Sequence, residues 1–146
     1  DLVMKGYLDM PDATAETIKD GWLYTGDVAE IEEDGFIYIK DRIRDMIVTG
    51  GFNVVPSDVE AVLGQHPAVK ECVVFGLPDD KWGEAVQAAV EVHAGQPADE
   101  AEIIQYVKSR LDSVKAPKRV HFVDELPRSP VGKVLRREAK AQFQEA

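Results

Sequence analysis

Two charged side chains, those of Asp27 and Lys133, lie beside glycine- or proline-containing turns, where a sequence can present a reactive group to a ligand. Asp27 follows Thr25-Gly26, and its carboxylate can accept two hydrogen bonds from a vicinal diol. Arg42 lies a short hairpin further on and can reach the same ligand with a fork of donors. Lys133 follows a stiff loop at 127–132, which predicts an exposed point charge. Each residue also has a plain structural interpretation, as a turn carboxylate or a solvated cation.

The other common catalytic and metal-binding sets are missing from the sequence. There is no Gly-x-Ser-x-Gly motif, and Cys72 lies in the apolar run CVVFG, which predicts a buried thiol. The three histidines, at positions 66, 93 and 121, are far apart and lack companions at ligand spacing, so we expect no metal site. The run SPVGKV at 129–134 has the Gly-Lys of a phosphate loop but lacks its earlier glycine and its following Ser or Thr.

The composition predicts a globular protein of one compact unit, with room for a small extra piece. Of the 146 residues, 45% are hydrophobic and 30% are charged. No apolar run approaches a membrane span, no signal peptide opens the chain, and a single cysteine excludes an internal disulfide, so we expect a cytoplasmic location. Residues 1–20 have no initiator Met and no strong apolar period, which suggests a segment of a larger protein.

The charge is unevenly distributed along the chain. The net charge of −10 argues against nucleic acid as a partner. Residues 115–140, however, carry eight basic and three acidic side chains, whereas the remainder carries nine basic and 24 acidic ones. This basic stretch indicates either a contact with a phosphate-bearing small molecule or a solvated helix face, and charge alone favours the solvated face.

The elements that must position these residues fall on two sides of a charged cluster. Alternating apolar and polar residues predict a hairpin of strands 28–31 and 36–39, joined through Asp34-Gly35. The charged residues 40–45 then form a boundary or hinge. Beyond them we expect a capping box, Ser57 with Glu60, that starts a helix ending near 66–67, and a second helix capped by Asp99 with Glu102. The other expected elements are strands 46–48, 53–55, 69–76, 85–93 and 119–123, a loop at 127–132 and a helix at 135–143. The pattern predicts an α+β fold, with a small mixed sheet of about three strands covered by helices.

Three blocks in order resemble the fatty acyl-CoA synthetases of the adenylate-forming superfamily. They are DGWLYTGDVAEIEEDGFIYIKDRIR at 20–44, DMIVTGGFNVVPSDVEAVLGQHPAV at 45–69 and DELPRSPVGKVLRREAK at 124–140. The resemblance covers nearly the whole chain but only the C-terminal part of the family architecture. It implies that residues 1–41, which include the β-hairpin, are the C-terminal end of the large N-terminal domain. It also implies that 42–45 are the hinge and that 46–146 are the mobile C-terminal domain.

The resemblance implies a two-step reaction. A fatty acid, most similar to the long-chain branch, attacks the α-phosphate of MgATP to give an acyl-adenylate and pyrophosphate, and CoA then displaces AMP. Asp27 would hold the ribose hydroxyls of the adenylate, and Arg42 would assist at the ribose. Lys133 would stabilise charge on the carboxylate and α-phosphate during the first step. ATP and Mg²⁺ would be bound mainly by the N-terminal domain.

The resemblance also implies roles in domain movement and CoA binding. Arg44 matches the hinge position, usually Asp or Lys, about which the C-terminal domain swings between the two steps. Gly50, Gly51 and Phe52 correspond to the segment lining the pantetheine channel, where many relatives have Glu in place of the phenylalanine. Lys118 aligns with a region that contacts CoA. Trp82 is either a packed cover residue, which we favour, or a platform for adenine.

Alternatives remain open from the sequence. The chain could belong to an adenylating enzyme that loads a carrier protein or an aryl acid, or it could be a stand-alone binding module. The fragment by itself is expected to be inactive. The partners implied are a fatty acid, ATP, CoA and the N-terminal domain, and the sequence encodes no signal for peripheral membrane association.

Overall fold

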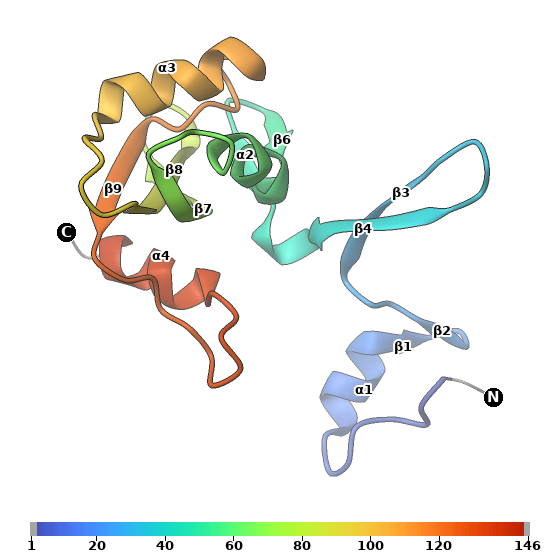
Figure 1. The fold of residues 1–146 in the computed structure, drawn as a ribbon. Helices are drawn as coiled ribbons and strands as arrows, with labels where there is room; N and C mark the ends of the chain where they lie inside the picture. The colour runs from blue at the N-terminus through green and yellow to red at the C-terminus, as the bar shows by residue number, and fades with distance from the viewer. Residues whose placement is uncertain (1–2, 145–146) are drawn as a thin grey trace.

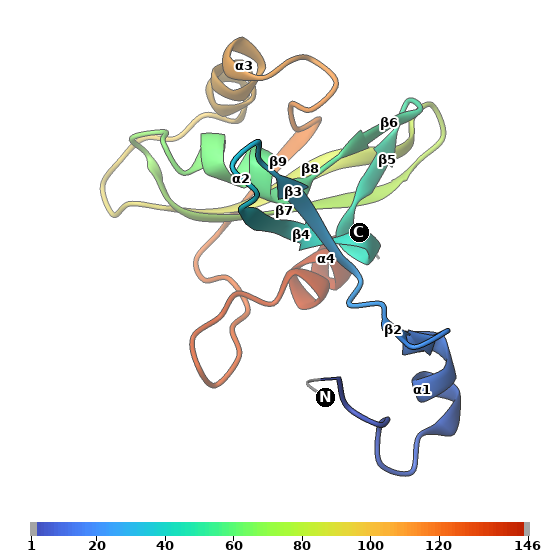
Figure 2. The same cartoon turned by 90° about the vertical axis from the view of Figure 1, so that its right-hand side faces the viewer.

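The computed structural model describes residues 3–144 and has two parts that follow one another along the chain (Figure 1). A thin N-terminal segment leads into a C-terminal part in which helices pack on a sheet, as the turned view also shows (Figure 2). None of residues 3–46 is buried, whereas buried positions recur from Ile47 onward. Within the described residues, no helix is long and apolar enough to cross a membrane.

The N-terminal segment consists of one short helix and two small antiparallel hairpins. Helix α1 (Pro11–Thr17) leads into β1 (Ile18–Lys19) and β2 (Trp22–Leu23), which pair with each other. Strands β3 (Asp27–Ile31) and β4 (Ile37–Arg42) form the second hairpin, as the sequence predicts, and the 3-10 helix η1 (Ile43–Asp45) follows it. Helix α1 and the β1–β2 hairpin are elements that the sequence analysis did not predict.

The β3–β4 hairpin contains a bulge close to its open end. Asp27 pairs with Arg42 and Val28 with Asp41, but Ala29 pairs with Ile39, so Lys40 is an extra residue on β4. A bulged residue leaves its backbone groups outside the regular ladder. The Lys40 carbonyl accepts a hydrogen bond of 2.8 Å from the Ser57 hydroxyl, which joins the hairpin to the C-terminal part.

The sheet of the C-terminal part has five strands in place of about three. They are β5 (Ile47–Thr49), β6 (Phe52–Val54), β7 (Val69–Asp79), β8 (Gly83–Val92) and β9 (Arg119–Val123). The long β8 pairs antiparallel with β7 over ten positions, parallel with β9, and at Gly83 with Thr49 of β5. The expected α+β class with a mixed sheet is therefore confirmed, and the larger strand count arises because the short β5–β6 hairpin joins the sheet edge.

Helices cover both faces of this sheet. One core joins α2 (Pro56–Leu63) and α3 (Glu100–Arg110) to sheet residues that include Val74, Val86 and Val90. The other core joins α4 (Arg136–Gln144) to the opposite face, where Phe75 and Leu77 lie. Because side chains alternate along a strand, β7 and β8 contribute apolar residues to both cores.

The start of α2 differs from the predicted capping box. Pro56 begins the helix two residues earlier than the capping box predicts, because its fixed φ suits the first helical position and it has no N–H to satisfy. Ser57 therefore lies inside the first turn, and its N–H donates to the Asp41 carboxylate at 3.1 Å. The Glu60 carboxylate accepts from the Val74 N–H at 2.8 Å and does not reach back to the helix start. In contrast, the predicted cap of α3 is confirmed, since Asp99 accepts from the Glu102 N–H.

Candidate functional site

The β3–β4 hairpin brings Asp27 and Arg42 together. The two residues are partners in the strand register, and Arg42 Nε lies 2.9 Å from Asp27 Oδ1. Arg42 also donates to the Thr25 carbonyl at 2.8 Å, so its guanidinium spans the turn that precedes β3. The Asp27 side chain keeps 22% of its surface exposed. A fixed carboxylate and a guanidinium thus lie side by side at a partly exposed position, and either group could bind a polar ligand.

Gly26 gives the chain the turn that presents Asp27. Its φ of +74° lies in the left-handed region, which glycine adopts without steric cost. Its carbonyl accepts from the Ile43 N–H at 2.8 Å, and the Asp27 N–H donates to the Thr25 hydroxyl at 3.1 Å. The turn before β3 is therefore tied to the start of η1, so Asp27 lies beside the segment that leaves the hairpin.

Arg44 lies on η1 between two acidic residues. Its side chain is 84% exposed, and its Nε is 3.9 Å from Asp45 Oδ1. An exposed ion pair of this length adds little stability, so the Arg44 side chain is held only weakly. The backbone on either side is held more firmly, because Asp41 and Asp45 both contact Arg136 of α4.

Arg136 is the centre of a partly buried cluster of three carboxylates. Its guanidinium contacts Asp41 at 2.9 Å, Asp45 at 3.2 Å and both oxygens of Glu60 at 3.0 Å. Burial is the largest single influence on the pKa of Arg136 and lowers it, but Glu60 and Asp41 together outweigh it, so the pKa lies above its ordinary value. The cluster connects the end of β4, η1, α2 and α4 around one permanently charged group.

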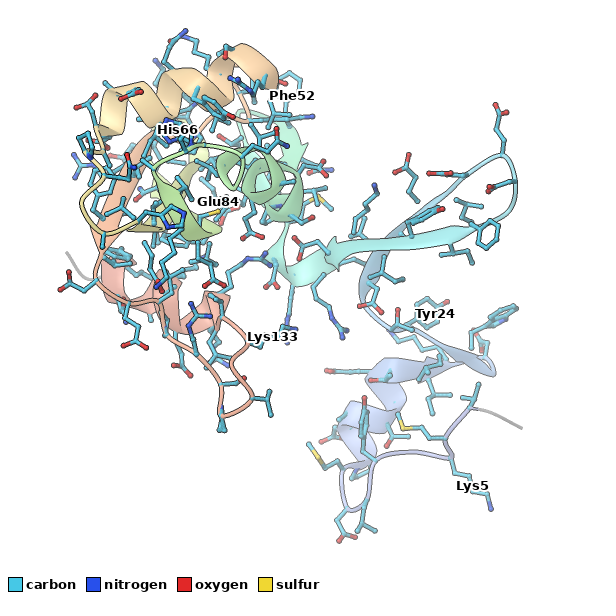
Figure 3. All side chains as sticks on the ribbon, in the orientation of Figure 1. Lys5, Tyr24, Phe52, His66, Glu84 and Lys133 are labelled. Carbon is cyan, nitrogen blue, oxygen red and sulfur yellow. The ribbon has the colours of Figure 1, made fainter. Side chains whose placement is uncertain are left out.

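Lys133 lies at the base of an exposed loop that leaves the body of the domain next to α4 (Figure 3). The loop is a small hairpin, closed by a bridge between Arg128 and Val134. The Ser129 N–H donates to the Lys133 carbonyl at 2.8 Å, and the Lys133 N–H donates to the Ser129 hydroxyl at 3.2 Å. The backbone of Lys133 is thus fixed while its side chain is exposed, as the sequence predicts.

The expected CoA residues gather at the β5–β6 turn. Gly50 and Gly51 both have positive φ, and the Gly50 N–H donates to the Trp82 carbonyl at 2.8 Å. A Cβ at Gly50 would lie 3.0 Å from the Trp82 ring, so that ring packs directly on the turn. Lys118 Nζ lies 5.6 Å from the centre of the same ring. Phe52 projects nearby with 60% of its surface exposed.

Lys118 is bound within its own loop. Its ammonium group donates to the carbonyls of Ser113, Val114 and Ala116. Burial, followed by the charge of Lys108, lowers the pKa of Lys118, and Asp112 opposes this shift. Contact with a phosphate would have to compete with these three carbonyls. Trp82 is half-buried over Gly50, which agrees with its interpretation as a packed cover residue.

Three of the eight basic residues at 115–140 pair with acidic side chains elsewhere in the chain. Arg128 contacts Glu71 and Glu91, Arg136 contacts three carboxylates, and Lys140 lies 3.8 Å from Glu84. The charge asymmetry of the sequence therefore becomes a set of ion pairs in space. Sequence analysis counted Arg128 and Arg136 only as basic residues, because their partners are 37 to 95 positions away and no local pattern connects them.

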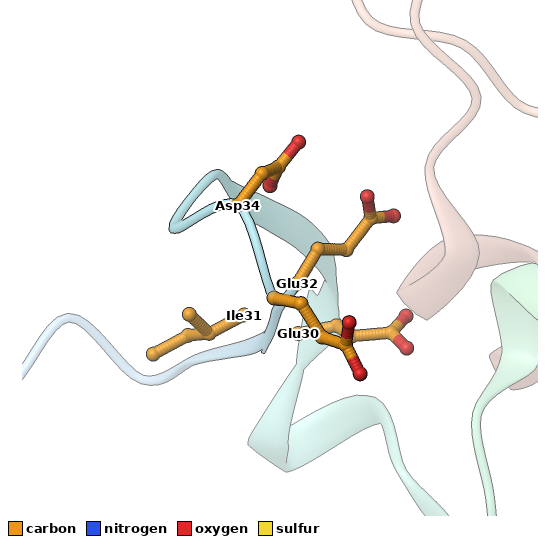
Figure 4. Close-up of a pocket in the computed structure, with 5 residues that line it drawn as sticks. Glu30, Ile31, Glu32 and Asp34 are labelled. Carbon is orange, nitrogen blue, oxygen red and sulfur yellow. The ribbon is translucent and has the colours of Figure 1, made fainter.

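The hollows of the described surface carry no candidate site. The larger one is lined by Glu30, Ile31, Glu32, Glu33 and Asp34 at the tip of the β3–β4 hairpin (Figure 4). Four carboxylates in an open hollow would repel a nucleotide phosphate. Across the described residues, His, Cys, Asp and Glu side chains form no group of three that could hold a metal ion.

Comparison with known proteins matches this architecture to one family. Residues 58–133 match the family model of the AMP-binding enzyme C-terminal domain. The chain is 51% identical to the medium/long-chain-fatty-acid–CoA ligase FadD8 of Mycobacterium tuberculosis (strain ATCC 25618 / H37Rv), covering 99% of the chain and 26% of that protein. It is 46% identical to the fatty acid–[acyl-carrier-protein] ligase ScoC of Streptomyces coeruleorubidus, covering 96% of the chain and 27% of that protein.

A solved structure gives the same result. The crystal structure of ATP-bound MatB from Rhodopseudomonas palustris superposes with a TM-score of 0.91 at 37% identity, covering 97% of this chain and 28% of that one. The chain therefore belongs to the AMP-binding enzyme C-terminal domain family. It spans about a quarter of the length of the curated relatives it matches.

Proposed function

We propose that this chain is the C-terminal portion of an ATP-dependent, AMP-forming acyl-CoA synthetase that acts on fatty acids. The similarity of the signature blocks to the long-chain branch supports a long-chain substrate. The observation that carries the proposal is the pairing of a tethered carboxylate and guanidinium, Asp27 and Arg42 at 2.9 Å, in the segment that precedes a family domain with Lys133 on a fixed loop. A relative that is 51% identical is a fatty-acid–CoA ligase, which supports the substrate class.

In the first step, an oxygen of the fatty acid carboxylate attacks the α-phosphorus of ATP. The bond from that phosphorus to the pyrophosphate oxygen breaks, which leaves an acyl-adenylate and pyrophosphate. Asp27 would accept hydrogen bonds from the two ribose hydroxyls, and Arg42 would hold Asp27 while donating toward the ribose. Lys133 would stabilise the negative charge shared by the carboxylate and the α-phosphate, which requires a positioned cation in a dry site. Mg²⁺, when bound, would neutralise charge on the phosphates, and we assign it no ligand in this chain.

In the second step, the sulfur of CoA attacks the acyl carbon. The bond to the AMP oxygen breaks, AMP leaves, and the thiol loses its proton. We propose that residues 1–41 belong to the large domain, that 42–45 form the hinge about Arg44, and that 46–146 swing between the steps. The exposure of the Arg44 side chain supports this, because a solvated residue can change orientation with little loss of contact.

For CoA, we propose that the turn at Gly50 and Gly51 lets the pantetheine arm approach the backbone closely, with Phe52 at its side. Lys118 would contact a CoA phosphate after leaving its own carbonyl partners. The positive φ of both glycines, the position of Gly50 beside Trp82 and the open space around Gly51 support the proposal. The partners of the complete protein are then a fatty acid, ATP, CoA and its own N-terminal domain.

One of the relatives supports a different acceptor for the acyl group in the second step. A relative that is 46% identical is a ligase that uses an acyl-carrier protein, so the thiol could belong to a carrier protein in place of free CoA. A panel of acyl acids and thiol acceptors with the full-length protein distinguishes the two. A carrier-loading enzyme would leave free CoA unused, and an aryl-acid enzyme would prefer aromatic acids to palmitate.

The central test is the variant Lys133→Ala in the full-length protein, assayed in each half-reaction separately. Fatty-acid-dependent exchange of pyrophosphate into ATP should fall by about 100- to 1,000-fold, the usual loss when one charge-stabilising donor is removed. Thioester formation from supplied acyl-adenylate should stay within about threefold of wild type. Equal losses in both half-reactions would contradict the role of Lys133. The chain alone, given ATP, CoA and palmitate, should release no AMP.

A further inference from the structure

Glu91 is a carboxylate buried in the sheet beneath the loop that carries Lys133. Its side chain is only 2% exposed. It accepts hydrogen bonds from Lys70 at 2.7 Å, from the Leu126 N–H at 2.8 Å and from Arg128 at 3.2 Å. Burial, the largest single influence, raises the pKa of Glu91, but the three donors together outweigh it and the pKa is lowered. The carboxylate therefore stays charged and needs its partners.

Arg128 connects this buried carboxylate to the loop. One terminal nitrogen of its guanidinium contacts Glu91 and Glu71, and the other donates to the Gly132 carbonyl at 3.2 Å as well as to Glu71. Gly132 immediately precedes Lys133 in the chain. The same guanidinium thus binds the sheet on one side and the backbone next to Lys133 on the other.

The remaining bonds of the loop do not attach it to the sheet. The Ser129–Lys133 bonds and the Gly132 N–H bond to the Ser129 carbonyl close the loop on itself. The bond from the Leu135 N–H to the Pro127 carbonyl lies at its base. These bonds fix the shape of the loop. The two ends of the loop are held on the sheet by the Leu126 N–H bond to Glu91 and by the packing of Leu126 and Val134 in the core, and Arg128 adds a contact from the buried Glu91 to the backbone next to Lys133.

We infer that Arg128 is a positioning residue for Lys133, and that Glu91 anchors it, so that the pair sets where the lysine ammonium stands during the adenylation step. This inference rests on the proposed function. A planar guanidinium suits the task because it offers donors in fixed, diverging directions, and Arg128 contacts four oxygens, one more than the three donors of an ammonium group. Misplacing a catalytic group by about 1 Å can cost about 100-fold in rate.

The test uses the full-length protein with the variants Arg128→Met and Glu91→Gln. Arg128→Met removes the guanidinium but keeps a long side chain, and Glu91→Gln keeps the acceptor for the Leu126 N–H but removes the charge. Arg110→Met is the matched control, since Arg110 is an exposed residue of α3 outside the cluster. Each variant is measured in both half-reactions, with the kcat and the KM for ATP determined separately in adenylation.

Arg128→Met should lower the kcat of adenylation by about 10- to 100-fold and leave the KM for ATP within about twofold. Its rate of thioester formation from supplied acyl-adenylate should stay within about threefold of wild type. Glu91→Gln should show the same selectivity with a smaller loss, and Arg110→Met should match wild type. A variant with a purely structural defect would instead lose both half-reactions together, and that result would overturn the inference.

The outcomes separate this inference from the proposed function. If wild type adenylates and Lys133→Ala is selectively defective, but Arg128→Met and Glu91→Gln adenylate normally, then the positioning role alone is refuted. If wild type shows no fatty-acid-dependent exchange, or Lys133→Ala is not selective, the proposed function fails and this inference fails with it. Should Arg128→Met unfold, a selective adenylation loss in folded Glu91→Gln supports the inference, and normal adenylation in that variant overturns it.

Discussion

Replacing Arg136 by methionine tests the cluster that joins the end of β4 and η1 to helices α2 and α4. Methionine keeps the length of the side chain but removes the guanidinium that contacts Asp41, Asp45 and Glu60. Three carboxylates would then face one another without a cation. The effect on stability should be large, because the side chain of Arg136 is 21% exposed and that of Asp41 only 7%.

The magnitude follows from the burial and the contacts. Removing one partner of a buried ion pair costs about 3–5 kcal/mol, and the partial exposure here places the expected loss at the low end, about 3 kcal/mol. Arg136 Nε is buried without a hydrogen-bond partner, so its removal returns part of this loss and supports the lower value. For a chain of this size the midpoint of thermal unfolding should fall by about 10 °C.

The assay is thermal unfolding of the chain followed by circular dichroism at neutral pH. The neighbouring variant Arg137→Met is the matched control, because Arg137 is exposed on the same helix. We expect the control to unfold within about 2 °C of wild type, since exposed charges contribute little. A loss below about 3 °C for Arg136→Met, or equal losses in the two variants, would refute the reasoning that the cluster stabilises the fold.

Three further predictions concern single residues. The pKa of Glu91 is lowered in the folded state, so its contribution to the free energy of unfolding is present above its unfolded pKa of about 4.5 and is lost as pH falls through the folded value. The difference in the free energy of unfolding between wild type and Glu91→Gln should therefore shrink in acid. A difference that does not change with pH down to 3 would contradict this. Burial raises the pKa of the Cys72 thiol from 9.0 to about 12. Alkylation of this thiol at pH 8, followed by mass spectrometry, should therefore be about 1,000-fold slower in the native chain than in the unfolded chain. Equal alkylation rates in the two states would disprove this prediction. Gly50→Ala should lower the free energy of unfolding, measured by urea titration, by about 1–2 kcal/mol. The reason is that φ of Gly50 is +56° and the new Cβ would lie 3.0 Å from the Trp82 ring. An unchanged free energy of unfolding would contradict this reasoning.

Local sequence patterns predicted the elements whose causes are local. The β3–β4 hairpin follows from alternation around a Gly-containing turn, and the start of α3 follows from Asp99 accepting from the Glu102 N–H. The prediction at Ser57 was wrong because the group that satisfies the first turn of α2 is Asp41, which lies 16 residues away. A capping pattern in the sequence cannot show that a side chain from another element will occupy the same place.

Some residues of the candidate site were predicted from the sequence, and others were not. Asp27 and Arg42 lie 15 positions apart, and the hairpin predicted from the sequence brings them close together, but the bulge at Lys40, which was not predicted, sets them directly opposite each other. Arg128 and Arg136 were not predicted as organising residues, since their acidic partners lie on distant elements. In the sequence, both residues belong to a basic stretch, and only the tertiary fold shows which carboxylates each one contacts.

The bulge at Lys40 limits how the length of the hairpin can vary among related chains. Deleting Lys40 would leave Asp41 opposite Val28 and Arg42 opposite Asp27, but it would remove the carbonyl that accepts from the Ser57 hydroxyl and joins the hairpin to α2, whereas an insertion here would move Arg42 out of register with Asp27. The turn at 32–35 lies at the other end of the hairpin and has no such constraint. Natural insertions and deletions should therefore collect at that tip and be absent between residues 39 and 42.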